Sequence, residues 1–500
     1  MNKSTYLATL ALGAGIFSQV VWAQTTSPFP PPNEELGIYV INSGAGLDTG
    51  CTYRGGGPLL INLEVPATMN PNELNPDGTL KDVNKLVTNK VIGSTAKISL
   101  PIYDIDDKAN TSGFMPEIDR VSFNGDYVKT LSGFNNTWVN DSFTVDISKV
   151  KFNTTNEIRV DIDTANAGSG EYWCMAVDWV SIEFDSSIPF VLAHGIAADA
   201  SSWDATSSPG VLSTMDDNGV LYTRFTTGMY GSVGSNAIDL KNQILGFLDT
   251  VKSDQVHIIA HSKGGLDSQA LAKLSPPEFE LLSLSTLSTP HRGSVAADLQ
   301  LIQRNLATIY VNQGQDPNGY AQQYVSRTVA GIASGFGAGP QPPGLNDLTT
   351  QAATAAINAR IRGNVQNTFT IGADAGPNCS RQPTDAEIDP MVNSAPFGTK
   401  WYAENTMRLA YQAICDFTSA VNLGTATTVV SVGATPTVIT TLTYSTVTAS
   451  TPQPNDIVVG IRSANPGWGT PLGDDSGTNH SNVKNGANIQ DILDRTIKLR

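Results

Sequence analysis

The sequence predicts two structural parts: an antiparallel β-sandwich over residues 37–185, then a doubly wound α/β domain with a mostly parallel sheet over 186–500. Three observations support this division. Short alternating runs separated by Asn, Gly and Asp turns fill the first part. Apolar strands alternate with helical runs in the second part. A β-branched run at 256–259 turns abruptly through small residues into a helix at 266–272.

Length and charge limit the classes of protein that fit. The chain has 500 residues, too many for a single core, so two or three domains are expected. Its formal net charge of −16 would repel phosphate groups and therefore argues against nucleic acid and against an anionic membrane surface.

The first residues predict export. Lys3 precedes an apolar run over 6–21 and a cleavage motif at Val21-Trp22-Ala23, which indicates a signal peptide over 1–23, a linker over 24–36 and a secreted protein. A membrane anchor is the alternative, but the run is short and broken by glycine. No later stretch is long and apolar enough to span a bilayer, so we expect no transmembrane segment in the mature chain.

The four cysteines fit an exported protein with two disulfides. Three pairings are open. The pairing Cys51–Cys174 with Cys379–Cys415 is favoured because each bond then lies inside one predicted part.

The first part carries alternating strand patterns at 120–123, 142–147 and 157–162, a hairpin turn at Asn124-Gly125 and a long strand over 172–184. Such a module serves either substrate binding or structural support. Within it, five carboxylates cluster in sequence and are weak candidates for a structural Ca²⁺ site. A solvated acidic loop is the alternative, since the spacing is not that of an EF-hand. These residues are Asp104, Asp106, Asp107, Glu117 and Asp119.

The second part alternates strands and helices. Strands are expected at 188–193, 221–226, 256–260, 281–287 and 369–371, and an amphipathic helix at 237–252. The long apolar excursion at about 296–356 predicts a lid, and the Thr/Val-rich run at 425–448 predicts additional β-structure.

The segment Ala260-His261-Ser262-Lys263-Gly264 matches a nucleophile elbow, with Ala in place of the first Gly. Small residues are needed because the turn holds the serine in a strained conformation and brings strand and helix very close. The alternative is that Ser262 only caps the following helix.

Together with this elbow, His194-Gly195 and the run 289–294 (TPHRGS) resemble the secreted bacterial lipases of the α/β-hydrolase superfamily, over about residues 186–500. The segment 345–350 is similar to one that those lipases carry near the lid. The resemblance implies a serine hydrolase with the chain order Ser, acid, His.

A serine hydroxyl needs an imidazole to remove its proton, and that imidazole needs a carboxylate. Of five histidines, four have other places: His194 in the oxyanion motif, His257 in a strand, His261 in the elbow and His291 in the strand-end motif. His480 remains, with an ordinary surface histidine as the alternative.

For the acid we expect Asp456, which follows a predicted strand and precedes His480 by a loop-sized interval; Asp474 and Asp475 are rivals. Backbone N–H groups of Lys263 and Ile196 are expected to form the oxyanion hole.

The expected function is hydrolysis of lipid esters through an acyl-enzyme intermediate, on substrate held at an interface. The alternatives are an extracellular polyester depolymerase whose β-sandwich binds polymer, an acyltransferase, and a non-catalytic adhesion protein. The chemistry requires no cofactor, and Ca²⁺ would be structural. A secretion foldase is left open as a partner.

Overall fold

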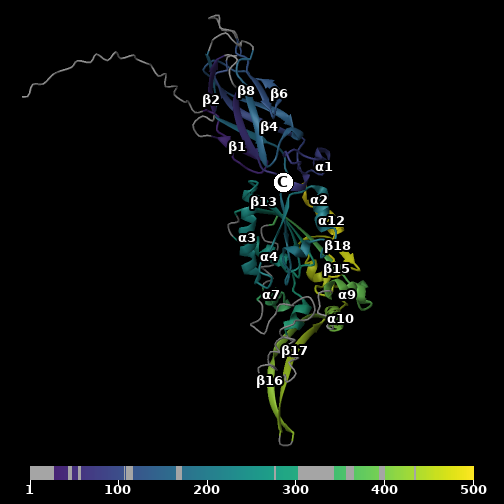
Figure 1. Ribbon diagram of the computed structural model, residues 1–500. Coiled ribbons are helices and arrows are strands. Elements are labelled where there is room, and N and C mark those ends of the chain that lie inside the picture. The colour runs from purple at the N-terminus through teal and green to yellow at the C-terminus, as the bar shows by residue number, and fades with distance from the viewer. Residues whose placement is uncertain are drawn as a thin grey trace, which may run out of the picture.

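The chain folds into two antiparallel sheets, a parallel sheet with helices on both faces, and a long hairpin at the far end of the molecule (Figure 1). The structure, a computed structural model, describes residues 27–42, 48–53, 58–105, 107, 116–164, 172–274, 278–301, 343–355, 365–392, 400–432 and 435–500. The predicted signal peptide and most of the predicted lid lie outside these residues.

The first antiparallel sheet is built around β4 (Thr95–Tyr103), which pairs along its length with β7 (Trp138–Asp146). It also pairs with β10 (Trp179–Glu183) and β9 (Tyr172–Val177), which pair in turn with β1 (Ile38–Asn42) and β2 (Asp48–Tyr53). The single strand predicted over 172–184 is wrong in one respect, because it divides at Asp178. There the register with β4 slips by one residue, as at a β-bulge.

The second antiparallel sheet has the order β3 (Leu59–Val65), β8 (Thr154–Asp161), β5 (Arg120–Phe123), β6 (Asp126–Thr130). Alternate residues of β3 and β8 are buried, the period expected of a half-buried strand. Buried residues of both sheets belong to one hydrophobic core. Short helices η1 (Pro71–Glu73), α1 (Val83–Thr88) and η2 (Ile147–Lys149) connect the strands.

The parallel sheet has the order β12 (Tyr222–Phe225), β11 (Phe190–Ala193), β13 (Gln255–His261), β14 (Glu280–Leu287), β15 (Asn367–Asp374), β18 (Thr470–Ser476). All five pairings are parallel, as the alternation of strands and helices predicts. Their carboxyl ends share one edge, where the polar motifs of the sequence follow the strands.

Helices cover both faces of this sheet. On one face, α3 (Val233–Asp249) and α4 (Lys263–Leu271) pack on alternate residues of β11 and β13. On the other, α2 (Val211–Asn218) and α12 (Gly486–Thr496) pack on the residues between them. Helix α3 begins four residues before the predicted start, where the Ser232 side chain accepts a hydrogen bond from Ser235 N–H.

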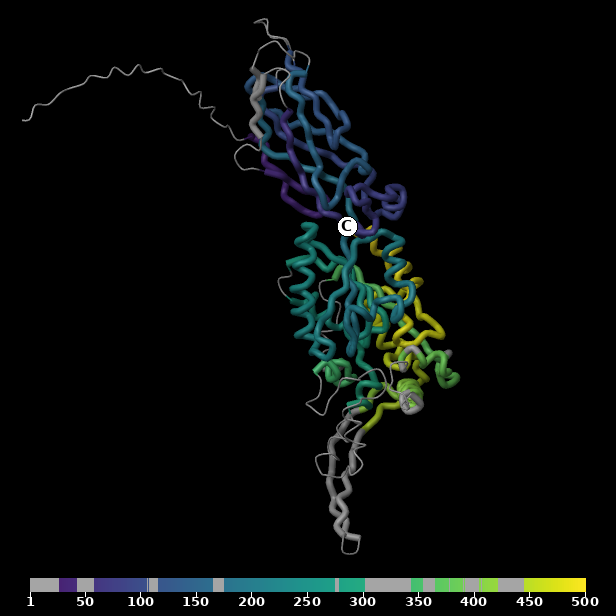
Figure 2. Tube along the Cα trace, viewed as in Figure 1, coloured from purple at the N-terminus to yellow at the C-terminus, as the bar shows by residue number. Residues whose placement is uncertain are grey.

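The β-rich part and the α/β part share a core. One continuous cluster joins Leu86 and Phe184 to Met215 and Val220, and Met69 forms a β-bridge with Val220. The C-terminal end of the chain lies at this junction (Figure 2). Removing the first part would therefore expose apolar surface of the second.

The remaining elements lie beyond the carboxyl edge of the parallel sheet or in its loops (Figure 1). The hairpin of β16 and β17 is longer than the predicted 425–448 run. Among the described helices none is both long and apolar enough to cross a bilayer. The elements are η3 (Ala200–Trp203), α7 (Pro343–Asp347), α8 (Thr350–Ala355), η4 (Pro377–Cys379), α9 (Asp385–Val392), α10 (Lys400–Asp416), β16 (Phe417–Val432), β17 (Thr435–Thr448) and α11 (Ile461–Ala464).

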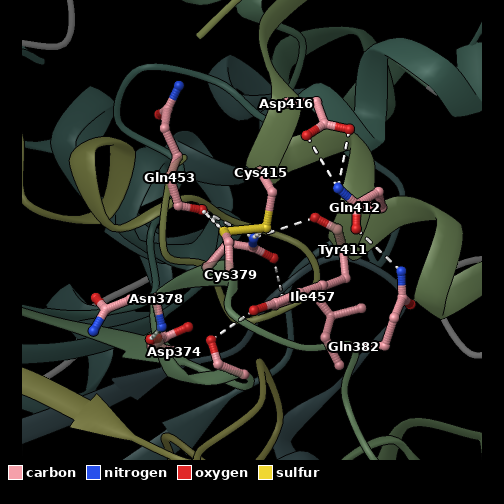
Figure 3. The surroundings of a disulfide bond; sticks show 12 residues. Asp374, Asn378, Cys379, Gln382, Tyr411, Gln412, Cys415, Asp416, Gln453 and Ile457 are labelled. Carbon is pink, nitrogen blue, oxygen red and sulfur yellow. Dashed lines mark hydrogen bonds between the residues drawn. A yellow bond between two sulfur atoms is a disulfide. The ribbon is translucent and has the colours of Figure 1, made fainter. Parts of the chain in front are cut away.

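The predicted disulfide between Cys379 and Cys415 is present, with the two Cα atoms 6.0 Å apart (Figure 3). It ties η4 to the end of α10. The other predicted pair is placed by backbone alone: Cys51 of β2 lies opposite Cys174 of β9 in the strand register. Their side chains lie outside the described part, so that bond stays a prediction.

Candidate active site

Ser262 lies at a sharp turn between β13 and α4. Its backbone has φ 53° and ψ −126°, a conformation that an L-residue seldom adopts. A Cβ atom on Gly264 would lie 2.4 Å from the carbonyl oxygen of His194, and one on Gly195 would lie 2.9 Å from Cβ of Ser262. These close approaches explain why the turn is made of small residues.

A buried histidine and a buried aspartate line up behind this serine. Nε2 of His480 lies 2.9 Å from Oγ of Ser262, and Nδ1 of His480 lies 2.8 Å from Oδ2 of Asp456. An ionised carboxylate only accepts hydrogen bonds, so Nδ1 carries the proton and Nε2 is left to accept from the serine hydroxyl. The structure thus brings the three predicted catalytic residues together in the order that proton transfer requires.

The carboxylate of Asp456 is fully buried, and backbone donors compensate its charge. Oδ1 accepts hydrogen bonds from the N–H groups of Val458 (3.0 Å) and Val459 (2.6 Å). Asp456 lies in the loop that follows β17, the strand that ends at Thr448. The Asn455 side chain holds this loop, because it accepts a hydrogen bond from the backbone N–H of Ile457 at 2.9 Å.

The rival acids are engaged elsewhere. Both lie in β18, where Asp474 accepts a hydrogen bond from Asn465 (2.6 Å) and Asp475 accepts hydrogen bonds from Asn485 (2.9 Å) and Asn488 (3.0 Å). Their side chains therefore hold Asn465, which precedes β18, and the two asparagines at the start of α12, which follows it.

The predicted oxyanion donors flank Ser262. Lys263 is the first residue of α4, where a backbone N–H has no acceptor within the helix and the helix dipole favours negative charge. Ile196 belongs to the loop that Gly195 brings against the serine. Both positions suit backbone donors aimed at a developing oxyanion.

Three of the other histidines are buried and take part in structural contacts. His194 bridges two backbone groups, since Nδ1 donates to the next carbonyl oxygen (2.8 Å) and Nε2 accepts from Thr227 N–H (3.0 Å). Burial lowers its pKa. His257 is buried in β13, and burial lowers its pKa to about 3. His291 packs edge-on against Trp468.

The part played by His261 could not be foreseen from the elbow motif. Its Nε2 donates a 2.7 Å hydrogen bond to the carbonyl oxygen of His480. Burial holds the pKa of His261 well below its ordinary value, so the ring is neutral. The two histidines are 219 residues apart in sequence, so this hydrogen bond can be recognised only in the folded structure.

A buried ion pair next to the elbow was also missed. The Lys263 ammonium donates to both carboxylate oxygens of Asp267, at 2.8 and 3.0 Å, and Asn236 donates to the same carboxylate at 3.0 Å. Burial raises the pKa of Asp267 to about 6, against the opposing effect of Lys263. The i, i+4 spacing on a helix was the available signal.

The alternative for the acidic cluster, a solvated loop, is wrong for Glu117 and Asp119. Both are buried, and Asp119 accepts a 2.7 Å hydrogen bond from the backbone N–H of Asp163. Burial raises the pKa of Asp119 to about 7. Asp106 lies outside the described residues. Among those described, no three His, Cys, Asp or Glu side chains are arranged to hold a metal ion.

Part of the chain is similar in sequence to triacylglycerol lipases. It is 29% identical over 155 residues, 30% of this chain, to enzymes so named from Pseudarthrobacter phenanthrenivorans and Burkholderia plantarii. It is 38% identical over 90 residues, 17% of this chain, to triacylglycerol lipase 2 of Saccharomyces cerevisiae. The matches span 43%, 38% and 28% of those relatives, less than half of each. No family model matches the sequence.

Solved structures with some likeness include a Bacillus licheniformis lipase in mature form, with a TM-score of 0.36 and 16% identity over 61% of this chain and 90% of that one. A metagenomic carboxyl esterase has a TM-score of 0.27 and 14% identity over 38% of this chain and 51% of that one.

Proposed function

We propose that this chain is a serine hydrolase that cleaves carboxylic esters of lipids through an acyl-enzyme intermediate. The observation that carries the proposal is the line of hydrogen bonds from Ser262 Oγ through His480 to Asp456, at 2.9 and 2.8 Å. Each partner is buried, so the hydrogen bonds form in a medium where they are stronger than in water.

In the first half of the reaction, Ser262 Oγ attacks the ester carbonyl while His480 Nε2 takes the hydroxyl proton. The tetrahedral intermediate collapses when the same imidazolium gives that proton to the departing alkoxide, which leaves as the alcohol. In the second half, His480 takes a proton from water, and the oxygen of that water attacks the acyl carbonyl. Return of the proton to Ser262 releases the carboxylic acid.

Asp456 stabilises the imidazolium and fixes the His480 tautomer, and three hydrogen bonds hold its carboxylate oxygens in place. The N–H groups of Lys263 and Ile196 receive the oxyanion, and losing one such donor typically costs about 3 kcal/mol of transition-state stabilisation. The hydrolysis of a carboxylic ester by this route needs no cofactor.

Two features favour lipid esters. Part of the sequence is similar to triacylglycerol lipases. An apolar cluster next to the elbow joins Leu266 of α4, Leu345 of α7 and Leu348, with Ile196 packed against it. Part of the Ile196 side chain stays exposed, and an acyl chain that reaches Ser262 would meet it. We propose that the excursion over about 296–356 covers this side of the site.

We further propose that the protein is exported through its N-terminal signal and that residues 37–185 form an accessory β-sandwich. The Cys379–Cys415 disulfide supports export, because such bonds persist in oxidising compartments. The shared core favours structural support as the first role of the β-sandwich.

A polyester depolymerase is the second candidate, and exposed aromatic side chains favour it. On the β-rich part, Tyr127 is 62% and Phe134 58% exposed, and exposed rings can pack on a polymer chain. Tyr127→Ser and Phe134→Ser are better tests than deletion, because deletion would open the shared core. Loss of polyester-film hydrolysis with soluble-ester turnover unchanged would support this candidate.

The experiment for the main proposal combines labelling with turnover. A fluorophosphonate probe should label the wild-type chain at Ser262, and a series of esters of rising acyl length, in solution and emulsified, should define the substrate. Failure to label Ser262 in folded protein would contradict the hydrolase and revive a non-catalytic adhesion protein. Transfer of the acyl group to an added alcohol in place of water would indicate an acyltransferase.

A further inference from the structure

Two loops meet at Ser262, and one buried lysine connects them. The first loop follows β11 and carries Ile196, and the second follows β18 and carries His480. We propose that Lys484 is a positioning residue that fixes these two loops relative to each other and so holds the His480 imidazole in line with Ser262. This inference rests on the proposed hydrolase function.

The side chain of Lys484 crosses from one loop to the other. Its ammonium donates a 2.7 Å hydrogen bond to the carbonyl oxygen of Ser202 and lies 5.5 Å from the centre of the Trp203 ring. Both partners belong to η3, at the end of the loop that contains Ile196. Lys484 is only 5% exposed, so the contact is part of the interior.

The contacts continue from Trp203 back to His480. The Trp203 ring meets the ring of His261 edge-on, with centres 6.5 Å apart, and His261 donates to the carbonyl oxygen of His480. Because Lys484 is only four residues after His480, the chain and these contacts form a closed ring. A closed ring of buried contacts restricts both loops more than either tie would alone.

The charge of Lys484 is unusual for a buried lysine. Burial lowers its pKa to about 8, and no carboxylate among the described residues offsets that effect. The titratable side chains that interact electrostatically with Lys484 are those of His194 and His261. Burial is the main cause that lowers the pKa of His194 and of His261, and the positive charge of Lys484 lowers both further. Neutral rings suit their fixed hydrogen bonds to carbonyl oxygens.

Lys484→Met tests the proposal, because it keeps the length of the side chain and removes both the donor and the charge. We expect kcat to fall about 10- to 100-fold with KM within about threefold, since a displacement near 1 Å can cost that much. The rate of fluorophosphonate labelling should fall in the same proportion. Lys484→Arg, which keeps charge and donor, should recover most of the loss. Lys252→Met, at an exposed lysine, is the matched control and should match wild type.

Loss of stability has to be separated from loss of positioning. Ile492→Ala leaves a cavity in α12 and should lower Tm while leaving kcat unchanged below the transition. If Lys484→Met lowers Tm but keeps wild-type kcat and labelling, or if Ile492→Ala loses kcat equally, the proposal is overturned. If Lys484→Met does not fold, Trp203→Phe takes its place, and an unchanged kcat in that variant overturns the proposal. Wild-type protein that neither labels nor turns over esters would instead defeat the proposed function.

Discussion

Nε2 of His480 lies 2.9 Å from Oγ of Ser262, although 218 residues separate them in the sequence. Ser262 follows β13 and His480 follows β18, and both strands run in the same direction in one sheet. Residues beyond the carboxyl ends of parallel strands meet at one edge, and this brings the two side chains together.

Ser262→Ala should abolish ester turnover, with a loss of at least about a thousandfold in kcat, because the hydroxyl group that attacks the ester carbonyl is removed. Tm should change by no more than about 2 °C, since only one hydroxyl group is lost. Initial rates on a soluble ester and a thermal melt check both parts. Turnover above one per cent of wild type would show that another nucleophile acts.

Asp456→Asn should lower kcat by about three to four orders of magnitude, because an amide does not hold His480 in the required tautomer. Asp474→Asn is the matched control, since it changes a carboxylate of β18 that accepts from Asn465. Comparison of kcat for the two variants decides which acid serves His480. Equal losses in both would argue against the assignment of Asp456.

Gly264→Ala should lower the free energy of unfolding by about 2 kcal/mol or more, because the new Cβ would lie 2.4 Å from a backbone oxygen. Gly246→Ala in α3 should instead raise it by about 0.5 to 1 kcal/mol, since a Cβ there meets nothing within 4 Å. Urea unfolding measures both. A stabilised Gly264→Ala variant would refute the tight turn.

Replacing Cys379 and Cys415 together by serine should lower the free energy of unfolding by about 4 kcal/mol, given their separation of 36 residues. We also expect lower kcat, because Cys415 contacts Asn455, the neighbour of Asp456 (3.4 Å). Urea unfolding and initial rates measure both. Substitution is preferable to reductant, which would act on any other disulfide too. If the variant keeps the stability of the wild type but has a lower kcat, the disulfide supports Asp456 independently of the overall stability.

The contribution of Lys484 to the stability of the protein should rise with pH between about 8 and 10.5. Burial lowers the pKa of Lys484 from 10.5 to about 8. Between these values the unfolded chain holds a proton that the folded chain has released, so the free energy of unfolding increases with pH. The difference between wild type and Lys484→Met isolates this effect, which could reach about 3 kcal/mol. A difference that stays constant from pH 7.5 to 10.5 would contradict it.

The sequence by itself determined the alternation of strands and helices, the elbow at Ser262, and His480 as the histidine left without another role. These signals are local, because hydrophobic period and small residues at a turn act over a few neighbours. The division of the strand at Asp178 and the conformation of the loop around Asp456 depend on strand register and on the hydrogen bond of the Asn455 side chain, and neither leaves a periodic pattern in the sequence. The start of α3 depends on the cap at Ser232, which precedes the apolar pattern of the helix.

Only the tertiary structure decided what surrounds the candidate site. The hydrogen bond from His261 to the His480 carbonyl, the Lys484–Ser202 contact and the core shared by the two parts all join residues far apart in the chain. Each depends on where packed sheets bring distant loops. In a sequence, a lysine that is buried in the fold cannot be distinguished from one that is exposed to solvent. Burial depends on the tertiary structure and not on the neighbouring residues in the chain.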